Sequence, residues 1–478
     1  MSQPRNSFAD NARQGIEQSA KAPSPPKPAE LSSAYKSEAH PSLLSLRSLA
    51  HNAEFDAFRQ AWPIAMKERG DEPFLVALYT LIAETELAAG NHDGLTEAAN
   101  VLIERFGAPE GHYALAQSEF LHGEYDAAIR RLESVVYKHR DYVDATRLLA
   151  KSLRDSGQIE AAWRSLETLL PRFNDTSIWS TMATLVESHA DFIRLLAHFH
   201  RQQDIHGSSS GAAVSEKGPL AYVALGALRV GNFTLAKMVW EDLLRHMATL
   251  PAAPPITEPT IVNYSSRRAQ LALIDLKRTL QTTDVPMFLV SGTLLGCVRE
   301  GQLLGHDHDV DVGIWDNVDR EHLLDTVRTS GLFYDKASRA PEIVRLKHVN
   351  GIIIDVFYHF RSPGDYWHRG VKIIWHNSPF GLATREFLGE EFLIPDDYDT
   401  YLTENYGDWR TPKINFDCAF DTPNAEVANR DELIIHTCKM LGQAMAAGTR
   451  GRTEFFLEKL KDLGRANLVE DLTKILSM

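Results

Sequence analysis

The chain has 478 residues, of which 44% are hydrophobic and 24% are charged, and its formal net charge is −14. This length exceeds what a single hydrophobic core usually supports, so two or more domains are expected. The acidic balance argues against a nucleic-acid-binding protein that relies on bulk positive charge. The three cysteines are few and show no CxxC spacing, which argues against a disulfide framework or a structural zinc site.

The first 40 residues are polar and include the tract PSPPKPAE at Pro23–Glu30. Such a segment buries too little apolar surface to offset the entropy lost on ordering, so residues 1–40 are predicted to be disordered. The segment has no apolar core of the kind found in signal peptides, and no later run reaches the ~18 apolar residues of a membrane span. We therefore expect a cytoplasmic protein without a transmembrane segment.

Residues 41–248 show helical periodicity, and a repeat is visible within them. The segments HGEYDAAIRRLESVV and SGQIEAAWRSLETLL superpose with a shift of 34 residues, which places Gly123 on Gly157 and Leu132 on Leu166. Glycine permits a tight turn between two helices, and the alanines that follow let the helices approach closely. The period and the Gly-x-[Tyr/Phe/Ile]-x-x-Ala core resemble the tetratricopeptide repeat, which implies a solenoid whose concave face binds a protein partner.

A proline-rich run, TLPAAPPITEPT, occupies residues 249–260 and marks the predicted domain boundary. The pattern beyond it is α+β over residues 261–425 and helical again over residues 426–478. The expected strands lie at 287–290, 309–315, 343–349 and 351–360, after a helix at 265–280. The fold class predicted for the whole chain is therefore multi-domain, an all-α helical-repeat solenoid followed by an α+β domain with a small mixed sheet.

Three aspartates alternate along the stretch DHDVDVGIW, which begins at Asp307 and continues into the predicted strand at 309–315. Because successive side chains of a strand point to opposite faces, Asp307, Asp309 and Asp311 are expected to share one face, with valines on the other. Neighbouring carboxylates need a cation, and oxygen-only ligands on a strand suit Mg²⁺ or Mn²⁺. Asp355 interrupts the apolar run GIIIDVFYHF, where a buried acid needs a partner, so we expect it to complete the metal site.

A run of small residues, Ser291, Gly292 and Thr293, follows the strand at 287–290 and opens a short helix. Its backbone allows close approach and its hydroxyls can donate, which suits a phosphate group at a helix N-terminus. Arg299 lies one or two turns further on and could pair bidentately with an anionic oxygen. This order of strand, small-residue turn, helix and two carboxylate strands resembles the nucleotidyltransferase superfamily.

The stretch GTLLGCVREGQLLGHDHDVDVGI resembles more closely the signature of the LicD/fukutin-related family. Two later stretches, IIIDVF and FLIPDDYDTYLTENYGDWRTP, resemble the downstream elements of that family in the same order. The likeness runs from roughly residue 260 to residue 425 and leaves the repeats outside. The chain departs from the family pattern at His306 and His308, because the family often has tryptophan before the first acid.

The resemblance implies transfer of a phosphate-linked group, such as phosphocholine or an alditol phosphate, from a CDP-activated donor to a glycan hydroxyl. In this interpretation Asp309, Asp311 and Asp355 hold two Mg²⁺ or Mn²⁺ ions that bridge the diphosphate. Residues 291–293 and Arg299 would hold the donor phosphates, and Asp355 would bind metal, accept the acceptor's proton, or both. The expected setting is the synthesis of lipopolysaccharide, capsule or another surface glycoconjugate.

The architecture also predicts a division of labour, in which the repeats recruit the enzyme to a glycan-assembly complex at the inner face of a membrane. A fragment that starts near Pro259 is then expected to keep turnover on a small acceptor.

Other interpretations remain open from the sequence. A nucleotidyltransferase proper would attack the α-phosphate of a nucleoside triphosphate and release pyrophosphate. A scaffold would bind a peptide on the solenoid while its second domain is catalytically inactive. The alternating aspartates alone would suit a solvated edge strand, and the two histidines could be zinc ligands or part of a metal phosphohydrolase.

Overall fold

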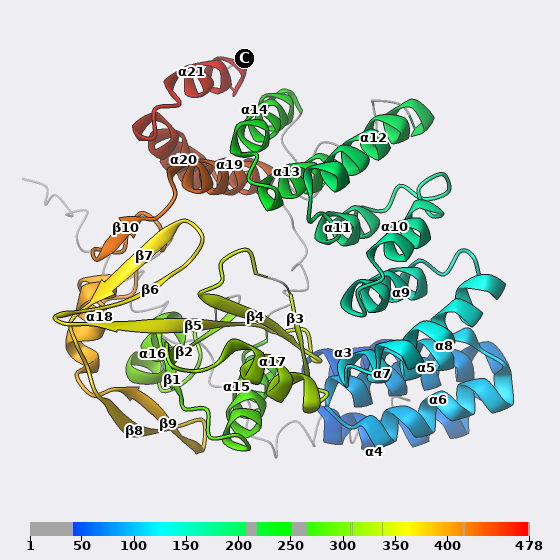
Figure 1. Ribbon diagram of the computed structural model, residues 1–478. Coiled ribbons are helices and arrows are strands. Elements are labelled where there is room, and N and C mark those ends of the chain that lie inside the picture. The colour runs from blue at the N-terminus through cyan, green and yellow to red at the C-terminus, as the bar shows by residue number, and fades with distance from the viewer. Residues whose placement is uncertain are drawn as a thin grey trace, which may run out of the picture.

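The computed structural model describes residues 42–206, 218–250, 265–305, 307, 309–336, 338–413 and 416–476. The predicted disordered segment, most of the predicted linker, His306 and His308 lie outside these residues. Figure 1 shows a curved array of helices that passes around one side of a domain built on a sheet. Within the described ranges, no helix combines the length and the apolar character that crossing a membrane requires.

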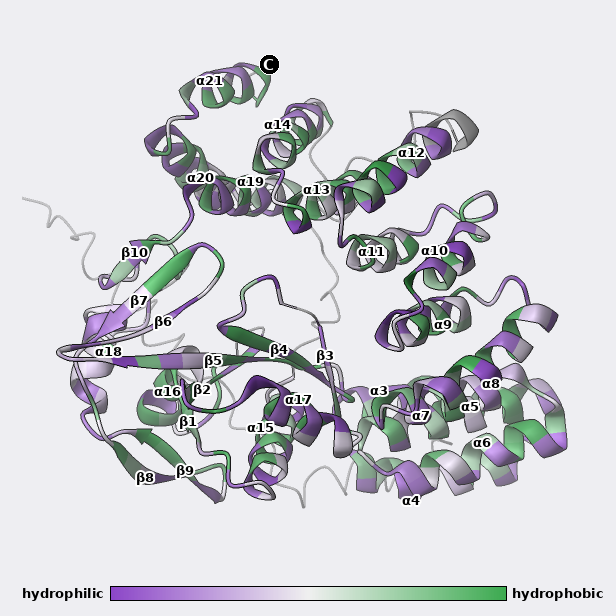
Figure 2. Ribbon diagram, in the orientation of Figure 1, coloured by the Kyte–Doolittle hydropathy of each residue, from purple (hydrophilic) through white to green (hydrophobic). Residues whose placement is uncertain are grey.

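The repeat region is helical, as the sequence predicts. Ala128, Leu132, Ala162 and Leu166, which are the repeated apolar positions, are all fully buried between helices. Figure 2 shows hydrophobic and hydrophilic residues sharing each helix of the array, as expected for helices that bury one face. The helices are α3 (Leu43–His51), α4 (Phe55–Glu68), α5 (Glu72–Ala88), α6 (His92–Phe106), α7 (Pro109–Leu121), α8 (Tyr125–Lys138), α9 (Val143–Asp155), α10 (Ile159–Glu167), α11 (Thr176–Thr184), α12 (His189–His206), α13 (Pro219–Arg229) and α14 (Phe233–Thr249).

The turns inside the repeats depend on glycine. Gly123 and Gly157 have φ angles of 74° and 80°, in the left-handed region that side chains with a Cβ rarely adopt. Each glycine lies between the two helices of its repeat, α7 and α8 or α9 and α10. The superposition of these two glycines in the sequence therefore reflects a shared turn geometry.

The helices that end the chain extend the same array. They are α19 (Arg430–Ala446), α20 (Arg450–Asp462) and α21 (Ala466–Leu476), and α14 packs against both α19 and α21. Their buried residues Cys438, Leu441 and Phe456 belong to the hydrophobic core that runs through the repeats. The sequence predicted these helices correctly as helices, but it did not show that they share a core with the solenoid.

The second domain is built on a mixed sheet, as expected, and ten strands of the described residues take part in it. Its order is β10-β7-β6-β5-β2-β1-β9-β8, while β4 pairs with β5 and β3 pairs with β4. The β2–β5 and β1–β9 pairs are parallel and the others are antiparallel. The strands are β1 (Met287–Leu289), β2 (Asp309–Trp315), β3 (Phe333–Asp335), β4 (Ile343–His348), β5 (Ile353–Ser362), β6 (Asp365–Arg369), β7 (Ile373–Asn377), β8 (Leu382–Phe387), β9 (Glu390–Pro395) and β10 (Ala425–Val427).

One face of this sheet packs against helices. The side chains of Val310, Val312 and Ile314 are fully buried in a second core, together with residues of two long helices. These helices are α15 (Ser266–Gln281) and α17 (Arg320–Thr329). Shorter helices connect the strands elsewhere: α16 (Ser291–Leu295), the π-helical turn η2 (Gly296–Glu300) and α18 (Tyr398–Tyr406). The residues that alternate with the buried valines therefore lie on the opposite face.

The two parts of the molecule contact each other directly. The ring nitrogen Nε2 of His92 lies 3.1 Å from the carbonyl oxygen of Gly331, and the rings of Phe120 and Tyr334 have centroids 6.2 Å apart. Farther along the array, Arg339 of the sheet domain forms an ion pair with Glu432 of α19. The solenoid is therefore packed against the sheet domain at separate places.

Candidate active site

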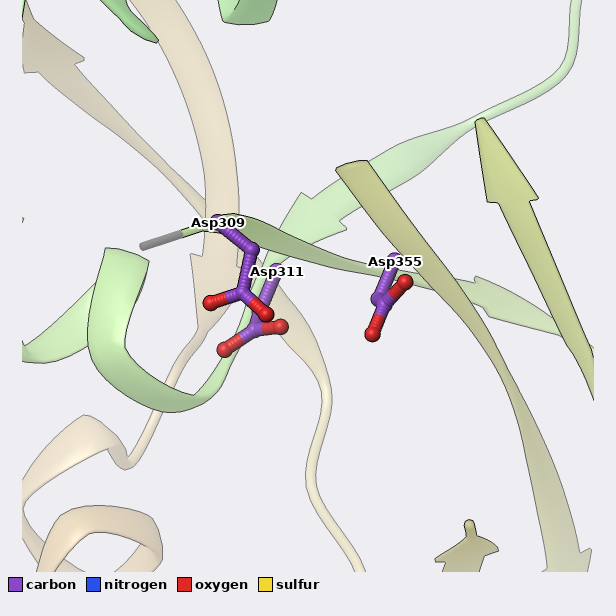
Figure 3. A group of neighbouring side chains, drawn as sticks. All are labelled: Asp309, Asp311 and Asp355. Carbon is purple, nitrogen blue, oxygen red and sulfur yellow. The ribbon is translucent and has the colours of Figure 1, made fainter. Parts of the chain in front are cut away.

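Three carboxylates come together where β2 and β5 run side by side. The parallel register places Asp311 directly opposite Asp355, and Asp309 lies two residues earlier on β2. One oxygen from each of the three carboxylates can be chosen so that all lie within 4.8 Å of one another. Figure 3 shows the three side chains extending to the same side of the two strands. The structure thus brings together the three acids that the sequence selected from separate segments.

The hydrophobic pattern fixes this register. Val310, Val312 and Val356 alternate with the acids and are fully buried on the helix-covered face of the sheet. A slip of one residue in either strand would exchange buried valines for carboxylates, at a large cost in free energy. The core on one face of the sheet therefore positions the acids on the other.

Asp307 lies just before the carboxylate strand, because β2 begins at Asp309, as predicted. The charge of Asp307 and a side-chain hydrogen bond that it shares with Asp309 both contribute to the raised pKa of Asp309, so Asp307 lies close to that acid. That all three aspartates share one face of a strand stays a prediction. A carboxylate oxygen of Asp307 occupies the space that a Cβ atom on residue 292 would need, which only glycine leaves open. Asp307 is also outside the group of three acids, so its role as a metal ligand stays a prediction.

The site concentrates negative charge. Burial, followed by the charges of Asp355 and Asp307, raises the pKa of Asp309 to about 7. Burial, followed by the charges of Asp309, Asp307 and Asp355, raises the pKa of Asp311 well above its usual range. A divalent cation would relieve this repulsion, and a set of carboxylate oxygens suits Mg²⁺ or Mn²⁺. The residues present therefore fit the predicted metal.

Arg345 is part of the site and was not identified from the sequence. Strand β4 pairs with β5 so that Arg345 lies opposite Asp355, and its Nε atom donates to Oδ1 of Asp355 at 2.7 Å. A second guanidinium nitrogen of Arg345 donates to the other oxygen of Asp355, which makes the pair bidentate. The Arg345 side chain is 47% exposed, whereas that of Asp355 is 5% exposed. The only sequence signal for Arg345 was the alternation in IVRLKH, where it lies between two apolar residues. This pattern indicates that Arg345 faces away from the core, but it does not identify Asp355 as its partner.

The small-residue turn is attached to the carboxylate strand. The backbone N–H of Asp311 donates to the hydroxyl of Thr293 at 2.8 Å, and Thr293 is almost fully buried. The N–H of Gly292 donates to the Asp311 carboxylate, and Ser291 has a left-handed φ of 48°. The turn therefore lies beside the acids and helps to position them. The phosphate-binding roles of Ser291, Gly292 and Thr293 stay predictions.

Arg299 contacts other parts of the protein. Its Nε donates to Glu300 at 2.8 Å and its Nη1 donates to the carbonyl oxygen of Trp409 at 3.1 Å. These contacts tie η2 to the segment that follows α18, and only 13% of the Arg299 side chain is exposed. Its predicted role in phosphate binding stays a prediction.

Two tyrosines of α18 lie within electrostatic reach of the acids and were also not identified as site residues. Burial raises the pKa of both Tyr401 and Tyr406, and the negative charge of Asp311 contributes to each shift. The hydroxyl of Tyr401 is buried and has no hydrogen-bond partner among the described residues. Only the fold reveals this proximity, because α18 is about 90 residues from β2 in the sequence.

Comparison with known proteins assigns the domain. Residues 284–397 match the family model described as "LicD/FKTN/FKRP, nucleotidyltransferase domain", and residues 119–185 match a tetratricopeptide-repeat model. The chain therefore carries a LicD/FKTN/FKRP domain preceded by a tetratricopeptide-like repeat, which confirms both resemblances. The matched segment includes the small-residue turn and all three clustered acids.

Curated relatives include the ribitol-5-phosphate transferase FKTN of several mammals. The Homo sapiens protein is 24% identical over 182 residues, which cover 36% of this chain and 40% of the relative. The Mus musculus protein is 25% identical over 170 residues, which cover 34% of this chain and 37% of the relative. The chain thus spans about two fifths of the length of the curated relatives that it matches.

Proposed function

We propose that this chain is a metal-dependent transferase that moves a phosphate-linked group from a CDP-activated donor to a hydroxyl of a glycan. The observation that carries this proposal is the group of Asp309, Asp311 and Asp355, with ligand oxygens within 4.8 Å of one another. The group lies inside the segment that matches the LicD/FKTN/FKRP family. The relatives named as ribitol-5-phosphate transferases support an alditol phosphate as the transferred group.

In this proposal the acceptor oxygen attacks the phosphorus that carries the transferred group. A bond forms between them, the bond from that phosphorus to the bridging oxygen breaks, and CMP leaves with the bridging oxygen. The acceptor's proton passes to a carboxylate of the site or to water.

Each side chain of the site has a separate proposed role. Asp309, Asp311 and Asp355 would hold one or two Mg²⁺ or Mn²⁺ ions, which supply positive charge for the diphosphate and its transition state. Arg345 fixes the orientation of the Asp355 carboxylate by donating a hydrogen bond to each of its two oxygens. Ser291 and Gly292 would present the turn to the donor phosphates. Asp355 would serve as a metal ligand, as the proton acceptor or as both.

A panel of donors tests this proposal. The full chain is incubated with Mg²⁺ or Mn²⁺, a mixture of glycan acceptors, and either CDP-linked alditols, CDP-choline or nucleoside triphosphates. Release of CMP with transfer to the acceptor supports the proposal. Release of pyrophosphate from a triphosphate would support the alternative of a nucleotidyltransferase proper. Absence of both products in the presence of either metal would favour the inactive-scaffold alternative.

We also propose, from architecture alone, that the repeats bind a protein partner of a glycan-assembly complex at the inner face of a membrane. Stacked helix pairs present an extended surface that commonly serves this purpose. A pull-down with the full chain tests this, and the partner should be lost when exposed solenoid residues are changed while donor turnover is kept.

A further inference from the structure

A row of basic side chains begins beside the clustered acids and crosses two further strands. In the pairing of β4 with β5, Arg345 lies opposite Asp355, and Lys347 follows two residues later on the same face. Lys347 lies opposite Tyr334 of β3, and the backbone N–H of Lys336 donates to the carbonyl of Arg345 at 2.8 Å. The face of the sheet that carries the acids therefore continues outward as a basic surface.

The solenoid supplies more positive charge at the end of this row. Arg147, Lys151 and Arg154 are spaced four and three residues apart on α9, so they share one face of that helix. The Nζ atom of Lys151 lies 5.6 Å from the centroid of the Tyr334 ring on β3. Figure 1 shows β3 beside the solenoid helices. The basic face of α9 thus adjoins the basic row of the sheet.

Electrostatic interactions connect the two sets. Burial lowers the pKa of Lys151 to about 8, and the positive charges of Arg147, Lys347, Arg154 and Lys336 lower it as well. Burial and the charge of Arg147 also lower the pKa of Lys347. Lysines of the sheet domain and cations of the solenoid are therefore close enough to repel each other.

The arginines of these two sets form ion pairs with acids. Arg147 pairs with Asp144 at 3.0 Å, Arg154 pairs with Asp155 at 2.6 Å, and Arg345 pairs with Asp355. In the part of the chain that the structure describes, no ion pair is formed by these lysines: Lys151, Lys336 and Lys347. Partly buried lysines that repel one another favour an anion between them.

We propose that these six residues form an acceptor site for an anionic glycan, so that the solenoid takes part in substrate binding. We call them the basic strip: Arg147, Lys151, Arg154, Lys336, Arg345 and Lys347. This proposal rests on the proposed transferase function, because the strip would lead the acceptor hydroxyl to the carboxylates. The ligand is a glycan that bears phosphate or carboxylate groups along its chain.

The length of the strip favours the acceptor over the donor. The face of α9 from Arg147 to Arg154 is about 10 Å long at 1.5 Å per residue. The distance from β5 across β4 to β3 adds about 10 Å at the usual spacing of strands. A nucleoside diphosphate engaged at the acids would not extend along both segments, whereas several sugar residues would. In a chain with a formal charge of −14, such a local basic surface also directs an anionic polymer to one place.

Charge-neutralising variants test the acceptor site from both sides. Lys151→Gln removes a charge from the solenoid, Lys347→Gln removes one from the sheet, and Lys138→Gln on the exposed end of α8 is the matched control. Acceptors are phosphorylated maltooligosaccharides, oligogalacturonate and neutral maltooligosaccharides of equal length. Binding is measured by calorimetry without donor, and transfer is measured separately with the CDP-linked donor.

The expected result is a loss of at least about tenfold in affinity for an anionic oligosaccharide in each strip variant. The KM for that acceptor rises in step, the KM for the donor is unchanged, and the effect shrinks at high salt. Lys151→Arg and Lys138→Gln should behave as the wild type. Whichever anionic oligosaccharide binds more tightly, the phosphorylated or the carboxylated one, identifies the anionic group of the acceptor.

Wild-type binding of both anionic oligosaccharides by folded Lys151→Gln and Lys347→Gln proteins would overturn the proposal, as would tighter binding of neutral chains. The binding assay contains no donor, so its result is independent of the transferase proposal. If the protein binds anionic oligosaccharides through the basic strip but releases no CMP, the proposed anion site is supported and the proposed transferase function is rejected.

Discussion

At the scale of single residues, Gly292 leaves room for the carboxylate of Asp307 in the site. A Cβ atom at position 292 would collide with the Asp307 carboxylate, which is the nearest group to it. The same glycine donates its N–H to Asp311. A methyl group at this position must therefore displace an acid beside the proposed metal site.

Gly292→Ala is expected to lower kcat by about tenfold or more and to cost about 1–3 kcal/mol of stability through overpacking. Steady-state kinetics and chemical denaturation measure the two effects. Gly305→Ala is the matched control, because a Cβ atom at residue 305 meets nothing within 4 Å. Equal kinetic effects of the two substitutions would show that the contact with Asp307 is unimportant.

The raised pKa of Asp309, about 7, predicts a pH dependence of metal binding. A carboxyl group whose pKa is higher in the folded state than in the unfolded state binds more protons when folded. This group therefore makes the metal-free protein less stable as the pH rises from about 4 to 7. Since Mg²⁺ binds the ionised form, the stabilisation by Mg²⁺ should grow over the same range. Thermal unfolding with and without Mg²⁺ at pH 5.5 and pH 8 measures it.

The increase in melting temperature on adding Mg²⁺ should be larger at pH 8 than at pH 5.5, and Asp309→Asn should remove most of this difference. An Mg²⁺ effect of the same size at both pH values would contradict the assignment of Asp309 as a ligand that titrates near neutral pH.

At the scale of elements, the pair β2 and β5 shows what the sequence could predict. Alternation along DVDVGIW placed Asp309 and Asp311 on one face, and the apolar run around Asp355 marked a second strand. The sequence did not contain the register, which depends on packing against α15 and α17. For that reason the bidentate partner Arg345 was missed. Asp307 lies just before the strand begins, so the strand alone does not fix where its side chain lies.

Neighbouring positions on β2 should respond in opposite directions. Val312→Ala removes buried methyl groups and should cost about 2 kcal/mol of stability, with little change in kcat. Asp311→Asn removes a buried charge that its neighbours repel, so it should stabilise the metal-free protein while abolishing turnover. Chemical denaturation in EDTA and a turnover assay measure both. A destabilised Asp311→Asn protein would show that this carboxylate contributes to the fold as well as to the site.

At the scale of the whole molecule, the solenoid and the C-terminal helices form one core. The repeat period and the proline-rich boundary were visible in the sequence, so the order of the domains could be predicted. The packing of the C-terminal helices against the solenoid could not be predicted, because the contacts of α14 with α19 and α21 join segments about 200 residues apart. Ion pairs of Lys237 with Asp431 and of Glu241 with Arg465 accompany this core.

The shared core changes the expectation for a fragment that starts near Pro259. Without α14, the buried faces of α19 and α21 would be exposed, so the fragment should melt at a lower temperature and bind an apolar dye. Thermal unfolding and dye fluorescence of the fragment and the full chain measure this. A fragment that is monomeric, as stable as the full chain and fully active would show that the solenoid is dispensable for both folding and chemistry.

The central claim is that Asp309, Asp311 and Asp355 form the metal site of a transferase that uses a CDP-linked donor. The most direct measurement is CMP release from that donor, with Mg²⁺ or Mn²⁺, by the wild type, Asp309→Asn and Asp325→Asn. Asp325 is an exposed acid of α17 and serves as the matched control. We expect the rate to fall by about 10²–10³-fold in Asp309→Asn, through lost electrostatic stabilisation, and to stay unchanged in Asp325→Asn. Near-normal CMP release by a folded Asp309→Asn protein would contradict the account.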